Sequence, residues 1–524
     1  MNATDRHPTE PDRGTAAPGR RGAHLPRPHR PHPGPDFGLL IRLCLITLVV
    51  GVLTGLAAAG LVWLLHIIED FVYGQHEGDL KVVTEGTTAL QRFLGITVAG
   101  LIAGPAWYLV RRIGDPIESV EDGMDGVRMP AAETAANAVL QMATVAAGAS
   151  VGRENAPREL GAMFANQITR RLGVNPELTR VLVAAAAGAG LGAIYHIPLA
   201  GAIFALEILL TTITVRACMV VLACSAVATV TSGIIVGTRP LYSTINLSEG
   251  FGNLAAAIVL GVVLGLVGVA FRRLISHVQD AAPTGAGVLW QLPGAFILVG
   301  LMAIWLPEVL GNGRNAATQV LEDNPAWTFI AALAAAKLIA VAVTLRSGAV
   351  GGILTPGFAL GSMAGYLLGV VLHPLMPQVP PTDFALLGAA AFLSTAMAAP
   401  LFALVVTVEF TGQSSSAYLA LFLAAATAAL AAELVRGRSM LPTTLPWNRR
   451  TGVQDRDLLR EAHEWELESA EYEAHAEHAA RAADATAAEA AGAAGFAADP
   501  DPGTGATRAD GMEPEGPAEP AGGR

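Results

Sequence analysis

The fold is decided by two short stretches that match each other, Val151-Gly152-Arg153-Glu154-Asn155-Ala156-Pro157 and Val350-Gly351-Gly352-Ile353-Leu354-Thr355-Pro356. Each has a glycine followed five residues later by a proline. A second pair follows in the same order, His196-Ile197-Pro198-Leu199 and Ala398-Ala399-Pro400-Leu401, and nine residues after each proline stands an acid, Glu207 or Glu409. The offsets nearly agree, since 351 − 152 = 199 and 400 − 198 = 202. The sequence therefore predicts an internal repeat, with halves at about 93–236 and 290–446.

The chain around these motifs is too apolar for an ordinary soluble protein, with 52% hydrophobic and only 15% charged residues. Residues 43–65 form a block of 23 without a formal charge, and a membrane span needs roughly 20. Further apolar blocks predict roughly ten or more membrane segments and an all-α fold. The uncharged block 347–382 is interrupted by glycines and a proline, so we expect broken helices there, with their irregular backbone inside protein or beside water.

The net charge of −11 is unevenly distributed along the 524 residues. Residues 451–524 hold 17 acids and 5 arginines, a net −12, which leaves +1 for residues 1–450. A nearly neutral body argues against nucleic-acid binding, which needs a basic face. We predict three parts: a disordered cytoplasmic segment at 1–36, a membrane domain at 37–446, and an acidic cytoplasmic tail at 447–524 that is partly helical and then disordered.

The charges that flank the spans predict the orientation in the plasma membrane. Arg111, Arg112, Arg436 and Arg438 belong on the cytoplasmic side, and the acidic connection at 69–85 belongs outside. Both termini are then cytoplasmic.

The repeated motifs suggest an anion site. A glycine-rich turn that opens a helix leaves backbone N–H groups free, and the helix dipole adds partial positive charge. Two such motifs meeting at the membrane midplane form a site between the halves, as in transporters with internal repeats. The alternative is that the glycines only permit close helix packing.

Glu154 lies in the first motif in an apolar region, where a carboxylate is costly unless it is paired or titrates. An ionised Glu154 can occupy an anion site and a protonated one can leave it, which makes it a candidate gate and proton carrier. The alternative is a salt bridge with Arg153 or Arg158, although Glu159 suits that pairing better. For Lys337, the favoured interpretation is a snorkelling side chain, or one bonded to helix-end carbonyls.

The four motifs together resemble the signatures of the CLC family of chloride channels and chloride/proton antiporters, over roughly residues 40–445. This resemblance implies an inverted repeat of short, tilted and broken helices, and a homodimer with one anion pathway per subunit. It implies that Glu154 is the gate and that the anion is held mainly by backbone groups of Gly152, Arg153, Asn155, Gly351, Gly352, Ile353, Leu354 and Thr355. Anion partners are chloride or a related small anion, with protons as a second possible partner.

The sequence departs from the family pattern at the site itself. Asn155 and Ala156 stand where glycine and proline are usual, and Leu354 stands where phenylalanine is usual. The best alignment puts Asp115 in the position of a serine that faces the anion, and Leu441 near the position of a central tyrosine. The position of the inner glutamate of proton-coupled members falls on Ile208, with Glu207 one residue before it, which turns its side chain by roughly 100°.

We therefore expect transport of chloride or a similar small anion, as a channel or as a proton-coupled antiporter. The alternatives are a fluoride-selective or other anion exchanger of the same fold, and a non-transporting scaffold that acts through its acidic tail. Nothing resembles a metal cluster, a nucleophile elbow or a nucleotide-binding loop, so we predict no enzyme activity, no cofactor and no metal.

Overall fold

The computed structural model describes residues 37–74, 86–238, 240–242, 246–247, 250–322 and 325–436. The chain divides into two compact units, residues 1–439 and 440–524, and every described residue belongs to the first. The predictions for residues 1–36, for the acidic tail and for Leu441 concern residues outside the described part.

The first group of helices is α1 (Phe37–Tyr73), α3 (Ala89–Ile113), α4 (Val120–Met124), α5 (Ala131–Ala146), α6 (Asn155–Arg171), α7 (Pro176–Tyr195), α8 (Pro198–Phe204), the π-helix η1 (Ala205–Leu210) and α9 (Val215–Val236). The second is α10 (Phe251–Asp280), α11 (Val288–Trp305), the 3₁₀-helix η2 (Pro307–Val309), α12 (Arg314–Glu322), α13 (Trp327–Arg346), α14 (Leu354–Leu372), α15 (Pro381–Ala396), α16 (Pro400–Thr411), the 3₁₀-helix η3 (Ser415–Ala417) and α17 (Tyr418–Arg436).

In the described ranges, nine helices are long and apolar enough to cross a membrane. The segments 198–210 and 400–411 are apolar but shorter. Many large apolar side chains are exposed, for example Leu101 and Ile102 on α3 and Val230 and Ile234 on α9, as expected of surfaces that contact lipid. The uncharged block 347–382 is not one straight span: it holds residues 347–353 outside helix, then α14 from Leu354, and the start of α15 at Pro381. The expected break does not fall at Pro356 or Gly361, because α14 continues through both.

Backbone geometry repeats between the halves at a fixed offset. His196 and Ala398, which directly follow Tyr195 and Met397, both have left-handed φ angles, 58° and 51°, and 398 − 196 = 202. Such angles are uncommon for residues other than glycine. His196 follows the end of α7 and Ala398 follows the end of α15. At each of them the chain changes direction before the short helix α8 or α16, which begins with a proline.

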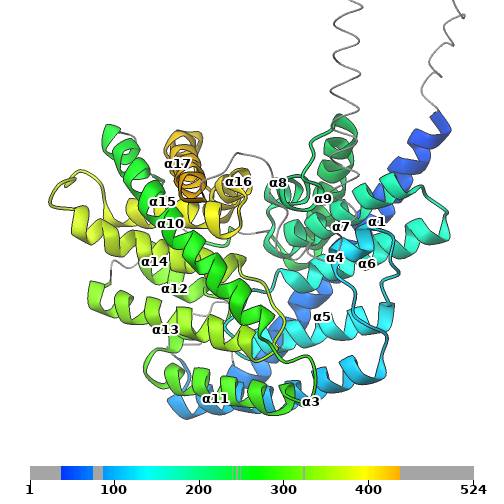
Figure 1. The fold of residues 1–524 in the computed structure, drawn as a ribbon, viewed down its shortest axis with the longest axis horizontal. Coiled ribbons are helices and arrows are strands. Elements are labelled where there is room, and N and C mark those ends of the chain that lie inside the picture. Colours follow the sequence, from blue (N-terminus) through cyan, green and yellow to red (C-terminus); the bar gives the residue numbers. More distant parts are fainter. Residues whose placement is uncertain are drawn as a thin grey trace, which may run out of the picture. The chain divides into compact units, whose positions relative to one another are not determined.

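Small residues let the central helices approach closely. A Cβ added to Gly190 on α7 would overlap the carbonyl of Pro157 on α6, and one added to Gly365 on α14 would overlap the carbonyl of Phe384 on α15. The two pairs place α7 and α15 in the core, where nearly all of their side chains are buried. Figure 1 shows α8 and α16 facing each other between the group containing α7 and the group containing α15.

One local difference separates the halves. The residues after α8 form a π-helix that ends at left-handed Thr211, whereas α16 stays α-helical to Thr411 and ends at left-handed Gly412. From Glu207 to Thr211 is four positions, and from Glu409 to Gly412 is three. The first half therefore has one extra residue, which the wider i→i+5 turn of a π-helix accommodates.

Candidate anion site

The two glycine motifs meet, as the sequence predicted. The Gly152 N–H donates to the carbonyl of Gly352 at 2.7 Å, and the Gly352 N–H donates to the carbonyl of Gly152 at 2.9 Å. Helix α6 begins at Asn155, three residues after Gly152, and α14 begins at Leu354, two residues after Gly352. This pairing brings the N-terminal ends of two helices, one from each half, to a common point.

Glu154 lies at that point and is buried, with 3% of its surface exposed. Its Oε1 accepts a hydrogen bond from the Leu354 N–H at 2.7 Å. Its Oε2 accepts from the Tyr195 hydroxyl at 3.0 Å and lies 3.5 Å from the Thr355 hydroxyl. The carboxylate thus occupies the N-terminus of α14, where backbone N–H groups and the helix dipole favour negative charge.

The paired glycines make the space for this carboxylate. A Cβ on Gly152 would overlap Oε2 of Glu154, and a Cβ on Gly352 would overlap Oε1. Gly351 lies instead against Val151, whose side chain an added Cβ would overlap. The glycines at 152 and 352 are therefore needed for close approach to a negatively charged group as well as for backbone packing.

The predicted backbone donors divide into two groups. The N–H groups of Gly152 and Gly352 are used in their mutual bridge, so they do not face an anion in this conformation. The N–H of Leu354 faces the Glu154 carboxylate. Ile353 is the residue that precedes α14, and its carbonyl accepts the helical hydrogen bond from Gly357.

Asn155, where the family has glycine, faces away from the carboxylate of Glu154. Its Nδ2 donates to Oε1 of Glu159 at 2.7 Å and to Oε1 of Gln141 at 3.1 Å. Oε2 of Glu159 accepts from Asn137 and from Gln141. Side-chain amides thus hold Glu159, and within the described part of the chain neither Arg153 nor Arg158 forms a close ion pair with it, although the charge of Arg158 acts on it.

In the part of the chain that the structure describes, neither Arg153 nor Arg158 forms an ion pair with Glu154. Arg153 lies over the Tyr195 ring, with its guanidinium carbon 5.0 Å from the ring centre. Arg158 lies over Phe204 at 4.3 Å. Arg153 therefore contacts the ring of Tyr195, and the hydroxyl of Tyr195 in turn donates to Glu154.

The structure does not bring Asp115 or Glu207 to Glu154. Asp115 lies in the exposed connection before α4, and its backbone N–H donates to Glu133. The side-chain oxygen at the start of α4 belongs to Ser119, which caps that helix. Glu207 binds the first N–H groups of α16, those of Leu401 and Phe402.

Lys337 is fully buried and donates to the carbonyls of Val309 and Gly311, at 2.9 and 2.6 Å. This confirms the interpretation that it binds helix-end carbonyls. The Ser150 hydroxyl also donates to Val309, at 3.1 Å. Lys337 thus ties the η2 turn to α13, and Ser150, directly before the first glycine motif, ties the same turn to that motif.

Tyr195 is the site residue that the sequence analysis missed. It is the last residue of α7, 41 positions from Glu154 and 160 from Thr355, and its hydroxyl lies 3.3 Å from that of Thr355. The available signal was its position directly before the His196-Ile197-Pro198 turn, where the second half has Met397.

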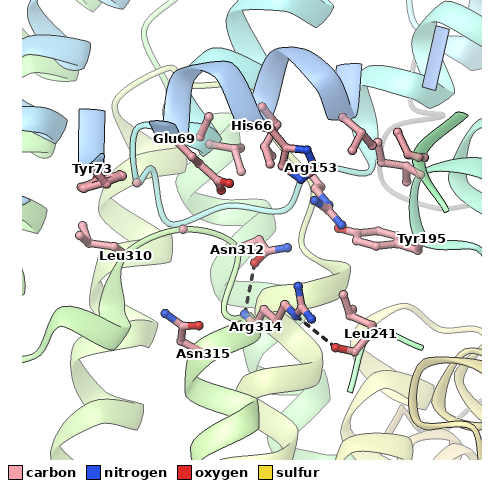
Figure 2. A pocket seen from close by; sticks show the side chains of 18 of the residues that line it. His66, Glu69, Tyr73, Arg153, Tyr195, Leu241, Leu310, Asn312, Arg314 and Asn315 are labelled. Atoms are coloured by element: carbon pink, nitrogen blue, oxygen red, sulfur yellow. Dashed lines mark hydrogen bonds between the residues drawn. The ribbon is translucent and has the colours of Figure 1, made fainter. Parts of the chain in front are cut away.

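A cavity of about 500 Å³ adjoins the site. Tyr195 and Arg153 line it on the side of Glu154, and Arg314 and Asn312 line it from the start of α12. Figure 2 shows Arg153 and Arg314 pointing into this space from different elements, with Glu69 and His66 of α1 above it. We call this space the vestibule.

The fold and the site define an all-helical, multi-span membrane protein of two related halves, whose broken helices meet at one buried carboxylate. The family model described as voltage gated chloride channel matches residues 99–433, well over half of the chain. The chain therefore belongs to the CLC family of chloride channels and transporters. It is a protein of anion transport and not an enzyme.

Similar proteins and structures agree with this assignment. The voltage-gated ClC-type chloride channel ClcB of Salmonella typhi is 28% identical over 340 residues, which cover 63% of this chain and 81% of that protein. A putative ClcB-like chloride channel protein of Ralstonia nicotianae is 32% identical over 306 residues, covering 55% of this chain and 70% of that one.

Two solved structures share the fold. A slow cyanobacterial Cl⁻/H⁺ antiporter superposes with a TM-score of 0.66 at 21% identity, covering 76% of this chain and 95% of its own. A CLC-type fluoride/proton antiporter superposes with a TM-score of 0.58 at 21% identity, covering 75% and 95%. The predicted CLC-type, all-helical membrane fold is thereby confirmed.

Proposed function

We propose that this protein carries chloride or a similar small anion across the plasma membrane and that Glu154 is its gate. The observation that supports this most is the 2.7 Å hydrogen bond from the Leu354 N–H to Glu154 Oε1. A carboxylate at the start of α14 occupies the place that the helix N-terminus offers to an anion. Transported ion and ionised Glu154 thus compete for one site.

The competition gives a mechanism. Protonation neutralises Glu154 and weakens its charge-assisted hydrogen bonds, so its side chain leaves and an anion takes the N–H of Leu354. The hydroxyls of Tyr195 and Thr355, which now bind Glu154, become available as two further donors. The sequence alignment places Asp115 and Leu441 where the family has hydroxyl donors to the anion. In the proposed mechanism Tyr195 and Thr355 provide these hydroxyl donors instead.

The proposed orientation and assembly follow the charges and the family. Arg42, near the start of α1, donates to the carbonyl of Leu172 at the end of α6, beside Arg170 and Arg171. This basic end is the proposed cytoplasmic side, and both termini are cytoplasmic in the proposal. The homodimer that the family implies would use the exposed apolar side chains beside α8 and α16, such as Leu199 and Leu401.

The test is anion efflux from liposomes that contain the purified full chain, with simultaneous measurement of proton movement. We expect chloride efflux that rises as the pH falls, and efflux independent of pH in Glu154→Gln, because an amide carries no charge at any pH. Glu177→Gln, an exposed acid at the start of α7, is the matched control and should behave as wild type.

The outcomes separate the remaining alternatives. Chloride flux that drives protons uphill identifies an exchanger, and flux without proton movement identifies a channel or uniporter. A preference for fluoride would assign the fluoride alternative. If no halide crosses, or if deleting residues 451–524 abolishes flux while Glu154→Gln changes nothing, the proposed function is wrong.

A further inference from the structure

Arg158 is a second arginine near the gate, and it lies one helical turn beyond Glu154. Glu154 directly precedes α6, and residues four positions apart lie on the same face of a helix. From Glu154 the helix runs toward Arg170 and Arg171 in its last turn. Arg158 therefore lies between the gate and the basic end of α6.

The Arg158 guanidinium packs on an aromatic ring. Its carbon lies 4.3 Å from the centre of the Phe204 ring on α8, and the negative face of such a ring attracts a cation. Its Nε is buried and has no hydrogen-bond partner in the part of the chain that the structure describes. The Phe204 ring packs edge-to-face on Phe402 of α16, with ring centres 5.5 Å apart. The second half of the chain thus helps to hold this positive charge in place.

Arg158 interacts electrostatically with three acids on α4 and at the start of α6. The charges of Glu121, Glu154 and Glu159 all act on it, and its own charge acts on Glu154. Glu159 is held by side-chain amides, and Glu121 is partly exposed in the first turn of α4. Glu154 is buried, with 3% exposed, where the attraction between opposite charges is screened least. The fixed charge of Arg158 is therefore expected to matter most for Glu154.

Other titratable or charged side chains near Glu154 come from α1, from the loop before α6, from α7 and from the segment before α10: His66, Glu69, Arg153, Tyr195 and Tyr242. Tyrosines are neutral and arginines charged throughout the range in which a carboxylate titrates. His66 and Glu69 lie with Arg153 at the vestibule, as Figure 2 shows. All five are the same in wild type and in any variant at position 158, so a difference between these proteins reports on Arg158.

We propose that Arg158, acting through Glu154 and without binding it, sets the pH at which the gate opens. A fixed positive charge stabilises the ionised carboxylate, so protonation of Glu154 requires a higher proton concentration than it would beside a neutral side chain. The inference rests on the proposed function, in which protonation of Glu154 opens the gate. It adds the residue that determines the proton concentration at which this happens.

The experiment measures chloride efflux from liposomes that contain the purified full chain, over a series of pH values that are equal on both sides. In Arg158→Met the pH of half-maximal efflux should rise by about one unit, which is a tenfold change in proton concentration. Arg158→Lys keeps the positive charge and should move this pH less than half as far. Arg180→Gln is the matched control and should behave as wild type, since Arg180 is an exposed arginine of α7 that pairs with Asp125 at 3.4 Å.

A second neutral variant covers a folding defect in Arg158→Met. Arg158→Gln keeps a polar side chain and should raise the pH of half-maximal efflux by a similar amount, and thermal unfolding in detergent checks that each variant is folded. The inference is wrong if the folded neutral variants have the wild-type pH profile, or if Arg158→Lys moves the profile as far as Arg158→Met does. It is also wrong if neither neutral variant folds, because Arg158 then has a structural role.

The Glu154→Gln background separates this inference from the proposed function. Adding Arg158→Met to Glu154→Gln should leave efflux independent of pH, because the carboxylate on which Arg158 acts is absent. A pH-dependent difference in that background would mean that Arg158 acts through another group. If efflux depends on pH through Glu154 but not on the charge at position 158, only the role of Arg158 is refuted. If wild-type efflux is absent or independent of pH, the proposed function fails and this inference fails with it.

Discussion

Glu207 and Glu409 each bind the start of the other half's short helix. Glu207 accepts hydrogen bonds from the N–H groups of Leu401 and Phe402 on α16, and Glu409 accepts from those of Leu199 and Ala200 on α8. The acids and the amides are all related by the same offset of 202 residues. Each carboxylate therefore supplies acceptors to N–H groups that have no partner within their own helix.

This reciprocal arrangement predicts a loss of stability when either acid is neutralised. Glu207→Gln and Glu409→Gln should each lower the free energy of unfolding by about 1–2 kcal/mol, because a charge-assisted hydrogen bond at a helix N-terminus is replaced by a neutral one. Thermal unfolding in detergent measures this, with exposed Glu177→Gln as control. An unchanged midpoint in both variants, or a change of similar size in the control, would contradict the prediction.

Tyr195→Phe tests the hydroxyl that binds the gate. The variant keeps the ring against Phe410 and under Arg153 but removes the donor to Glu154, so ionised Glu154 is held less tightly by about 1–2 kcal/mol. At a chloride concentration that saturates the site, chloride efflux near neutral pH should rise by up to roughly tenfold. The half-saturating chloride concentration should rise as well, because the same hydroxyl is a proposed donor to the anion. Tyr242→Phe is the matched control, since the buried Tyr242 hydroxyl has no partner among the described residues, and its efflux should not change. Equal effects in the two variants would assign the change to packing.

Gly352→Ala tests the space around the carboxylate. Its new methyl group overlaps Oε1 of Glu154, and such overpacking costs about 1–3 kcal/mol. The cost should be at least halved in a Glu154→Ala background, where the overlapping atoms are gone, and thermal unfolding of the four proteins of this cycle measures the coupling. Gly294→Ala on α11 is the control, since nothing lies within 4 Å of its added Cβ. Additive effects at 352 and 154 would show that the methyl group disturbs something else.

Lys337→Met tests the buried cation. The variant keeps the length of the side chain but leaves the Gly311 carbonyl without its Lys337 donor and the Val309 carbonyl with the Ser150 hydroxyl alone, at a cost of about 2–4 kcal/mol. Ser150→Ala should cost about 1 kcal/mol, because Lys337 still binds the same Val309 carbonyl. Thermal unfolding of the two variants measures these costs. A smaller decrease in thermal midpoint for Lys337→Met than for Ser150→Ala would contradict the role of Lys337 as the donor to these carbonyls.

The sequence was sufficient to predict the class of fold and the meeting of the two glycine motifs. Both follow from patterns that repeat within the chain, namely apolar blocks of span length and paired Gly and Pro residues about 200 positions apart. Glu154 could be identified from the sequence because a carboxylate in an apolar block is costly unless it is paired or protonated. Each of these features can be identified within one short stretch of sequence, or by comparing two stretches that the repeat relates.

The partners of the site residues were not predictable in the same way. Tyr195 has no repeated counterpart, because Met397 stands at the matching position. Asn155 was identified as a departure at the site, yet its side chain binds Glu159 and Gln141, a choice fixed by how α5 packs on α6. Glu207 and Glu409 were found by their equal spacing after a proline, but only the juxtaposition of α8 and α16 shows what they bind.

The extra residue in the π-helix 205–210 has a consequence for how the two sides of the protein differ. A chain made of two like halves offers nearly the same local structure twice, and a fixed offset of 202 carries one copy onto the other through Glu207 and Glu409. Beyond Glu207 that offset becomes 412 − 211 = 201, so one residue between Glu207 and Thr211 has no counterpart in the second half. One residue turns a helical side chain by roughly 100°, so the side chains that follow the extra residue face a different direction from those that follow Glu409, and the two halves are no longer equivalent there.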